Sequence, residues 1–261
     1  MKDFHKKEAP LLGLQGSGGG LGFLAGGDSV GPPGPWYNNL NPFNDNSQVG
    51  YWKLESANPR NENNTSQVCS TQDGSPSYTP LGTAGYWNNP VNSTLNTNAN
   101  PRNSYPLSFS IWCYKETGDW ASGDQNQLLV NWSINGQRLS ICNVDWNGGG
   151  GANDWEWSIM YGGTNHWTFA PTRTENAWMH IVYCVQGNND SGHRLYQDGG
   201  SALSANNRGG GHGGSAGNAI GGNSTGGEDW NGWMYNVRLF NKMLTQSEAA
   251  QLYANDKPPG A

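Results

Sequence analysis

The C-terminal stretch of residues 218–256 constrains the fold more than any other part of the chain. It begins with a Gly-rich turn, continues as residues 230–240 with the side-chain alternation of a strand, and ends in a short helical segment. The alternation predicts one strand face with Trp233, Tyr235, Val237 and Leu239, and an opposite face with Met234, Asn236, Arg238 and Phe240. We therefore expect these residues to form the closing unit of a β-fold.

The helix that follows this strand carries its own start and stop signals. Thr245 lies three residues before Glu248, the spacing of a capping box in which each side chain satisfies a free backbone N–H. Leu244 and Ala249 have the spacing of a hydrophobic staple. Ala249, Leu252 and Tyr253 form an apolar stripe, which predicts that the helix docks on an apolar surface. Pro258 and Pro259 prevent the helix from continuing.

The rest of the chain favours short strands joined by turns. Only 13% of residues are charged, and Gly occurs 39 times, a composition that suits turns better than helices. Asn135-Gly136 is a hairpin signal, and residues 205–219 are expected to form a Gly-rich loop. We expect strands at 50–55, 107–115, 127–132, 138–144, 155–161, 167–169, 178–186 and 193–197, which together predict a two-sheet antiparallel sandwich.

Three blocks of sequence resemble laminin G-like, or concanavalin A-like, jelly-roll domains. They are LSFSIWCYK at 107–115, NAWMHIVYCVQGNNDSGHRLYQDGG at 176–200, and the closing unit. The resemblance covers roughly residues 80–256 and implies an all-β jelly roll of two antiparallel sheets with one short C-terminal helix. Because this fold carries lectins, adhesion modules, virion parts and glycanases, it leaves the function open.

An N-terminal tail, residues 1–49, is expected to precede a jelly-roll domain at 50–261. The tail is rich in Gly and Pro and alone cannot bury enough surface to order itself. Its Lys-Lys-Glu-Ala-Pro and Gly-rich start resembles that of structural proteins of marine tailed phages. We expect it to anchor the domain to an assembly, with a flexible linker as the alternative, through Phe4, His5, Lys6, Lys7, Leu11, Leu12, Leu14, Leu21, Phe23 and Leu24.

Net charge and cysteine content restrict the expected partners and the compartment in which the protein is made. The net charge of −6 at pH 7 argues against a nucleic-acid partner. No secretory signal or membrane-spanning run is visible, so synthesis in a host cytoplasm, reduced cysteines and no membrane insertion are expected. Buried apolar cysteines are favoured, and Cys113–Cys184 or Cys69–Cys142 disulfides remain the alternatives.

No catalytic motif is visible in the sequence. The strand-borne Glu-x-Asp-x-x-Glu of jelly-roll glycanases is absent, and the neighbours in Asp154-Trp155-Glu156 point to opposite faces of a strand. His180 matches the strand histidine of the family, for which a structural hydrogen bond is expected, and His193 and His212 lie in or beside loops. We therefore predict no enzymatic activity.

Calcium is the one cofactor that the resemblance suggests, since many family members bind it at one rim of the sandwich. Calcium prefers hard oxygen ligands from loops. The candidate ligands are Asp145, Asp154 and Asp229, with Asp229 the first choice. The alternative is that these are solvated turn carboxylates.

Tryptophan is unusually frequent, with 13 residues. Those in or beside Asn- and Asp-rich loops are candidates to stack on sugars, and Trp155 and Trp157 share one strand face. The candidates are Trp146, Trp155, Trp157, Trp167 and Trp230, with packing or a protein interface as the alternative. Trp112, Trp178 and Trp233 are expected in the core or between the sheets.

Together these features predict a non-enzymatic virion structural protein, a capsid decoration, head fibre or tail-associated component, with a lectin-like domain for attachment. Its expected partners are other virion proteins through the tail, host-surface glycans, and further copies of itself in a homo-oligomer. The alternatives are a cellular lectin-like adhesin and, more weakly, a glycanase.

Overall fold

The computed structural model describes residues 39–55, 59–71, 80–81, 84–85, 87–89, 94–115, 126–145, 155–161, 165–169, 174–187, 192–207, 216–223, 228–258 and 261. The chain divides into two units, residues 1–30 and 31–261, and every described residue lies in the second. The predicted anchoring residues between Phe4 and Leu24 therefore lie outside the described part of the chain.

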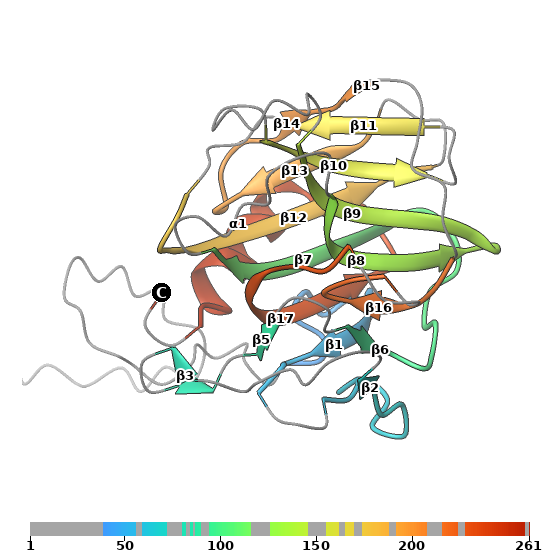
Figure 1. Cartoon of the computed structure of the whole chain (residues 1–261), viewed down its shortest axis with the longest axis vertical. Coiled ribbons are helices and arrows are strands. Elements are labelled where there is room, and N and C mark those ends of the chain that lie inside the picture. The colour runs from blue at the N-terminus through green and yellow to red at the C-terminus, as the bar shows by residue number, and fades with distance from the viewer. Residues whose placement is uncertain are drawn as a thin grey trace, which may run out of the picture. The chain divides into compact units, whose positions relative to one another are not determined.

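The described strands form two antiparallel sheets, which confirms the jelly-roll sandwich (Figure 1). The seven-stranded sheet has the order β1 (Gln48–Trp52), β17 (Gly232–Phe240), β7 (Leu107–Tyr114), β12 (Trp178–Val185), β13 (Arg194–Gln197) and β14 (Leu203–Ser204), with β5 (Trp87–Asn89) also paired to β17. The eight-stranded sheet has the order β15 (Asn206–Asn207), β11 (Asn165–Phe169), β10 (Trp155–Tyr161), β9 (Gln137–Asp145), β8 (Asn126–Ile134), β16 (Ala219–Ile220), β6 (Leu95–Asn96) and β2 (Ser70–Thr71). A separate pair joins β3 (Pro80–Leu81) to β4 (Ala84–Gly85).

The main core lies between the two sheets. Alternate residues of each long strand point inward, among them Ile111 of β7, Ile141 of β9 and Ile159 of β10, all fully buried. Trp132 contacts Phe109 and Trp52 edge-on, with ring centroids 5.4 and 5.8 Å apart. Each such side chain contributes roughly 1.5–3 kcal/mol by leaving water, so this inter-sheet layer is the main source of stability.

Local sequence signals set most of the element boundaries. Asn135 and Gly136 have φ of 51° and 78° and join β8 to β9 in the predicted hairpin. The first strand is Gln48–Trp52 and not 50–55, because Leu54 has a φ of 60° that ends the extended backbone. The predicted Gly-rich loop at 205–219 is wrong at its ends, where Asn206–Asn207 pairs with β11 and Ala219–Ile220 with β8.

The predicted alternation along the last strand is wrong beyond Tyr235. Asn236 has a φ of 45°, and the register between β17 and β7 shifts between Tyr235 and Arg238. This bulge inserts one residue and reverses the parity. Met234, Val237 and Leu239 consequently face the main core, whereas Trp233, Tyr235 and Phe240 belong to clusters outside it.

The closing helix α1 (Gln246–Asn255) has the predicted capping box: Glu248 N donates to Thr245 Oγ1, and Thr245 N donates to Glu248 Oε2. Leu244, Ala249 and Leu252 are buried with Val182 and Phe240 on the outer face of the seven-stranded sheet. Figure 1 shows α1 behind that sheet. The helix therefore covers one end of this face with a second, smaller core.

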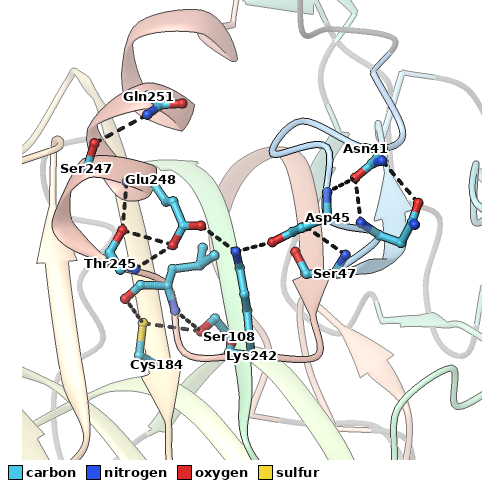
Figure 2. A network of polar contacts seen from close by, with 12 residues as sticks. Asn41, Asp45, Ser47, Ser108, Cys184, Lys242, Thr245, Ser247, Glu248 and Gln251 are labelled. Carbon is cyan, nitrogen blue, oxygen red and sulfur yellow. Dashed lines mark hydrogen bonds and ion pairs between the residues drawn. The ribbon is translucent and has the colours of Figure 1, made fainter.

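The N-terminal boundary of the sandwich lies earlier than predicted. Within the segment assigned to the tail, Asn39 O accepts from Arg238 Nη1 at 2.9 Å, and the Phe43 and Phe240 rings are 5.5 Å apart. Lys242 forms ion pairs with Asp45 and Glu248, linking this segment to the helix (Figure 2). A tail ending at residue 49 is therefore wrong, because residues 39–49 already pack on the sandwich.

The four cysteines are free and buried. Cys113 faces the main core, whereas Cys184 lies on the outer face beneath α1, so neither proposed pairing is formed. Burial raises the pKa of the Cys69 and Cys142 thiols to about 12. The packing interpretation of the cysteines is confirmed.

Candidate functional site: an aromatic row on the seven-stranded sheet

Three of the tryptophans predicted to stack on sugars are buried. Trp157 and Trp230 are 2% and 0% exposed, and their rings stack with centroids 6.0 Å apart. Trp167 is 6% exposed and packs edge-on against His193. The sugar-stacking prediction is wrong for these three residues, because a ring enclosed in the core has no face to offer a ligand.

A buried lysine holds Trp230 in place. Lys115 is fully buried at the end of β7, with its Nζ 4.3 Å from the centre of the Trp230 ring and hydrogen-bonded to Gln127 Oε1. A cation over an indole ring is attractive, and more so away from water. The polar residues at this end of the sandwich are thus used in packing.

The remaining predicted residues are described in part or not at all. Trp146 and Asp154 lie outside the described residues, and only the backbone is described for Trp155 and Asp145. Asp229 accepts a hydrogen bond from Thr94 Oγ1 at 2.8 Å. No group of three His, Cys, Asp or Glu that could hold a metal occurs within the described part, and calcium stays a prediction.

A row of three aromatic side chains crosses the outer face of the seven-stranded sheet. Trp178 of β12 is paired with Tyr114 of β7, which is paired in turn with Trp233 of β17. The Tyr114 ring contacts Trp178 and Trp233 edge-on, with centroids 5.7 and 5.4 Å away. We call Trp178, Tyr114 and Trp233 the aromatic row.

The next row along the same strands is closed by the helix. It consists of His180, Trp112 and Tyr235. Tyr253 of α1 stacks on Trp112, with ring centroids 5.6 Å apart and planes inclined by 18°. Trp112 and Tyr235 are therefore buried, whereas Trp178 and Tyr114 in the aromatic row remain half-buried.

Polar groups border the aromatic row. Tyr235 donates its hydroxyl hydrogen to Glu55 Oε1 at 2.8 Å, and Glu55 is exposed. Trp233 Nε1 is buried and has no hydrogen-bond acceptor among the residues that the structure describes. Beside α1, Lys257 Nζ lies 4.7 Å from the centre of the Tyr253 ring. The two half-buried rings of the row, Trp178 and Tyr114, thus adjoin Tyr235, which carries the exposed Glu55 carboxylate.

His180, next to the row, is structural, as expected. Its Nε2 shares a hydrogen bond of 2.8 Å with Ser110 Oγ, and its backbone N–H donates to Asp198 Oδ1 at 2.8 Å. Burial, followed by the charge of Arg238, lowers the pKa of His180 to about 3. Ser110, His180 and Asp198 do not form a catalytic triad, because the carboxylate binds the backbone of the histidine and both other residues are fully buried.

The outer face of the eight-stranded sheet has a different character. Arg138 is 3% exposed; its Nε donates to Ser140 Oγ at 2.7 Å, and Nη2 pairs with Glu228. Asn223 Nδ2 donates to Glu228 Oε2 at 3.2 Å, and Asn131 Nδ2 to Asn223 Oδ1 at 3.1 Å. These hydrogen bonds and this ion pair hold Asn223 and Glu228, which precede β17, against β8 and β9.

Two tryptophans of the row were expected in the core or between the sheets. Trp233 is buried as expected, but in a cluster outside the main core, and Trp178 is half-buried on the same outer face. The available signal was parity: Trp178 and His180 alternate with Met179 and Ile181, which face the main core. On β17 this signal was misleading, because the bulge at Asn236 could not be anticipated.

Comparison with known proteins places this geometry in a family. The concanavalin A-like lectin/glucanases superfamily matches residues 88–250. The chain belongs to this superfamily. No curated protein sequence matches the chain.

Solved structures share the fold at low identity. Domain 4 of AbnA, an extracellular GH43 arabinanase from Geobacillus stearothermophilus solved with arabinotriose, is 14% identical with a TM-score of 0.56, over 79% of this chain and 98% of that one. The receptor-binding domain of botulinum neurotoxin D is 13% identical with a TM-score of 0.52, and the match covers 83% of this chain but only 53% of the toxin domain. Trypanosoma rangeli sialidase, solved with the inhibitor DANA, is 13% identical with a TM-score of 0.53, over 79% of this chain and 32% of the sialidase.

The chain therefore has a lectin-like, concanavalin A-like fold whose structural neighbours include receptor-binding domains and parts of glycosidases. No helix in the described ranges has the length and apolar character needed to cross a bilayer.

Proposed function

We propose that the protein is a non-enzymatic carbohydrate-binding attachment protein and that its sugar site is the aromatic row. The observation that carries this proposal is a line of three adjoining aromatic side chains, one from each of three neighbouring strands, of which Trp178 and Tyr114 are half-buried. A pyranose ring presents apolar C–H groups on one face, which suits such a surface. Its hydroxyls need polar partners, and the exposed Glu55 supplies an acceptor.

The rigidity of the row supports recognition. Trp178 and Tyr114 are held on central strands of the sheet, and their rings brace each other at 5.7 Å. Aromatic side chains fixed in this way lose little conformational freedom on binding a ligand. Among the structural neighbours, the arabinanase domain was solved with a bound arabinotriose, which fits a carbohydrate ligand for this fold.

The polar groups near the row favour binding over hydrolysis. Glycosidases of the common type need two carboxyl groups about 5–10 Å apart on either side of the scissile bond. Beside the row, Glu55 is hydrogen-bonded to Tyr235, and Asp198 accepts from the backbone of His180. Burial raises the pKa of Asp198, but its hydrogen bond directs the carboxylate to the backbone of β12.

We propose that the protein is a component of a virion. The phage-like start and the Gly-rich composition of residues 1–38 support a role for that segment in joining the sandwich to other virion proteins, with the protein made in a host cytoplasm. In this arrangement the lectin-like body contacts host-surface glycans. Calcium at Asp145, Asp154 and Asp229 and assembly as a homo-oligomer belong to the same proposal.

The test is binding of the full-length chain to a glycan array, followed by calorimetry with the best ligand. Trp178→Ala is expected to weaken that binding at least about tenfold, since stacking of a ring on an aromatic face contributes roughly 1–3 kcal/mol. Unfolding free energy should fall by less than about 1 kcal/mol, because Trp178 is only half-buried.

Val68→Ala is the matched control. Val68 is a 48% exposed apolar residue that lies outside the aromatic row, and its truncation should leave binding unchanged. Equal affinity of Trp178→Ala and the wild type would remove the site from the row. Release of reducing sugar from the ligand by the wild type would refute the non-enzymatic part of the proposal.

A further inference from the structure

The charge at the edge of the aromatic row restricts the sugars that it can accept. Glu55 is exposed, and Tyr235 is its only hydrogen-bond or ion-pair partner among the described residues. The Tyr235 ring in turn contacts Trp178 edge-on, with centroids 6.4 Å apart. A carboxylate is thus held by one hydrogen bond to Tyr235, whose ring contacts the Trp178 ring on which a sugar would stack.

Three lysines of the described chain interact with groups other than Glu55. Lys53 Nζ lies 5.9 Å from the centre of the Tyr51 ring, and its charge acts on the buried Asp256. Lys257 Nζ lies over Tyr253, and its charge acts on Asp198. Lys115 follows Tyr114 along β7 but faces the interior and is fully buried. No described cation therefore neutralises Glu55 within ion-pair distance.

The chemistry of the carboxylate sets which ligand groups it accepts. A sugar hydroxyl can donate to Glu55, whereas a ligand carboxylate can only accept, and it would face a like charge.

We infer that the aromatic row selects neutral saccharides and rejects acidic ones, with the Glu55 carboxylate as the selecting group. This inference rests on the proposed carbohydrate function and adds to it the class of ligand. Tyr235 is a positioning residue, because its hydroxyl holds Glu55 at the edge of the row and does not itself reach the ligand.

The experiment compares pairs of ligands that differ only in charge. Oligogalacturonates and their methyl esters have the same rings and linkages, and the esters are neutral. Full-length wild type is expected to bind the esters at least about tenfold more tightly than the acids at low salt, and the ratio should fall as salt screens the charge. The same comparison with glucuronate oligosaccharides and their esters guards against a poor choice of sugar.

Glu55→Gln keeps an oxygen acceptor of the same shape and removes the charge. It is expected to bring the ester-to-acid affinity ratio close to one without loss of ester binding beyond about fivefold. Tyr235→Phe should lower the ratio only in part, since Glu55 remains but is no longer held. Glu62→Gln, a carboxylate elsewhere on the surface paired with Arg60, should leave the ratio unchanged.

The outcomes separate the two proposals. If the wild type binds esters and acids equally, or if Glu55→Gln leaves the ratio unchanged, the selectivity inference is wrong while carbohydrate binding stands. If neither member of either pair binds, and the glycan array is also blank, the proposed function itself fails and the inference with it. If Trp178→Ala abolishes ester binding and Glu55→Gln abolishes only the discrimination, both hold.

Discussion

The two ends of the outer face of the seven-stranded sheet are built from the same three strands but differ in how far they are buried. At one end, Ser108, Val182, Cys184 and Phe240 lie beneath α1 and are fully buried. At the other end, Trp178 and Tyr114 of the aromatic row stay half-buried, whereas Trp233 is buried. The strands contribute large side chains at both ends, so the helix, and not the sheet, decides which end is core and which end is available to a ligand.

The covered end is also where the chain termini of the sandwich are tied together. Arg238 donates to both carboxylate oxygens of Asp256 at 2.8 Å, and to Gln48 Oε1 at 2.6 Å, with its guanidinium 3.7 Å from the centre of the Tyr51 ring. Although burial favours the neutral form, the Asp256 charge raises the pKa of Arg238. This buried pair joins the end of α1 to β17 and β1.

Breaking this buried ion pair should have the largest effect on stability. Asp256→Ala leaves the Arg238 charge buried and uncompensated, which is expected to lower the free energy of unfolding by about 3–5 kcal/mol. Urea denaturation followed by tryptophan fluorescence measures the change. Glu62→Ala, which removes an exposed ion pair whose two side chains are 51% and 24% exposed, is the control and should cost less than about 1 kcal/mol. Equal losses in the two variants would show that the buried pair does not hold the termini together.

Truncating the helix contact should come next. Leu252 is fully buried against the sheet, and Leu252→Ala is expected to cost about 2–3 kcal/mol, because a single surface helix can shift to close part of the cavity. The measurement is again the urea midpoint. Glycan affinity at 25 °C should be unchanged, since the aromatic row does not depend on this contact. A loss of affinity without unfolding would mean that the helix and the row are one functional unit.

The smallest effect is expected from the surface ion pairs in Figure 2. Despite partial burial, hydrogen bonds from Lys242 and Ser47 lower the pKa of Asp45 to about 2, and those from Lys242 and Thr245 lower the pKa of Glu248. Carboxyl groups with lowered pKa stabilise the fold above their ordinary pKa near 4, and this contribution is lost as the pH falls toward about 2.

Lys242→Met tests this contribution. At pH 6 it should lower the free energy of unfolding by less than about 1 kcal/mol, since the three side chains are partly exposed. The difference from wild type should shrink when unfolding is measured at pH 3 and vanish near pH 2. A difference that is constant with pH would assign the effect of Lys242 to its contact with the Phe43 ring, where Nζ lies 4.8 Å from the ring centre.

The parts of the fold that follow from local chemistry could be predicted from the sequence. The capping box at Thr245 and the hairpin turn at Asn135-Gly136 need only particular residues at particular spacings, and both are present. These signals do not state which of two faces becomes the interior of a sandwich, because both faces of this sheet are apolar.

The candidate site was harder to predict for that reason. Trp157 and Trp230 lie next to polar loops in the sequence, yet their rings stack inside the sandwich. Trp178 and Trp233 lie in apolar strands, yet they pack outside the main core, where Trp178 is half-buried and Trp233 is buried. Proximity to polar residues along the chain is a poor guide to exposure when the other sheet and the helix determine the covering.

By itself, the sequence determined that this chain forms a two-layer β-sandwich closed by a capped helix, since those features depend on residue spacing within each element. The tertiary structure alone decided which tryptophans lie outside the main core and that Glu55 is hydrogen-bonded to their neighbour Tyr235. It did so through the one-residue bulge at Asn236 and the placement of α1, whose Tyr253 stacks on Trp112 while Trp178 and Tyr114 stay half-buried. Exposure depends on how separate elements stack, and no local pattern contains that information.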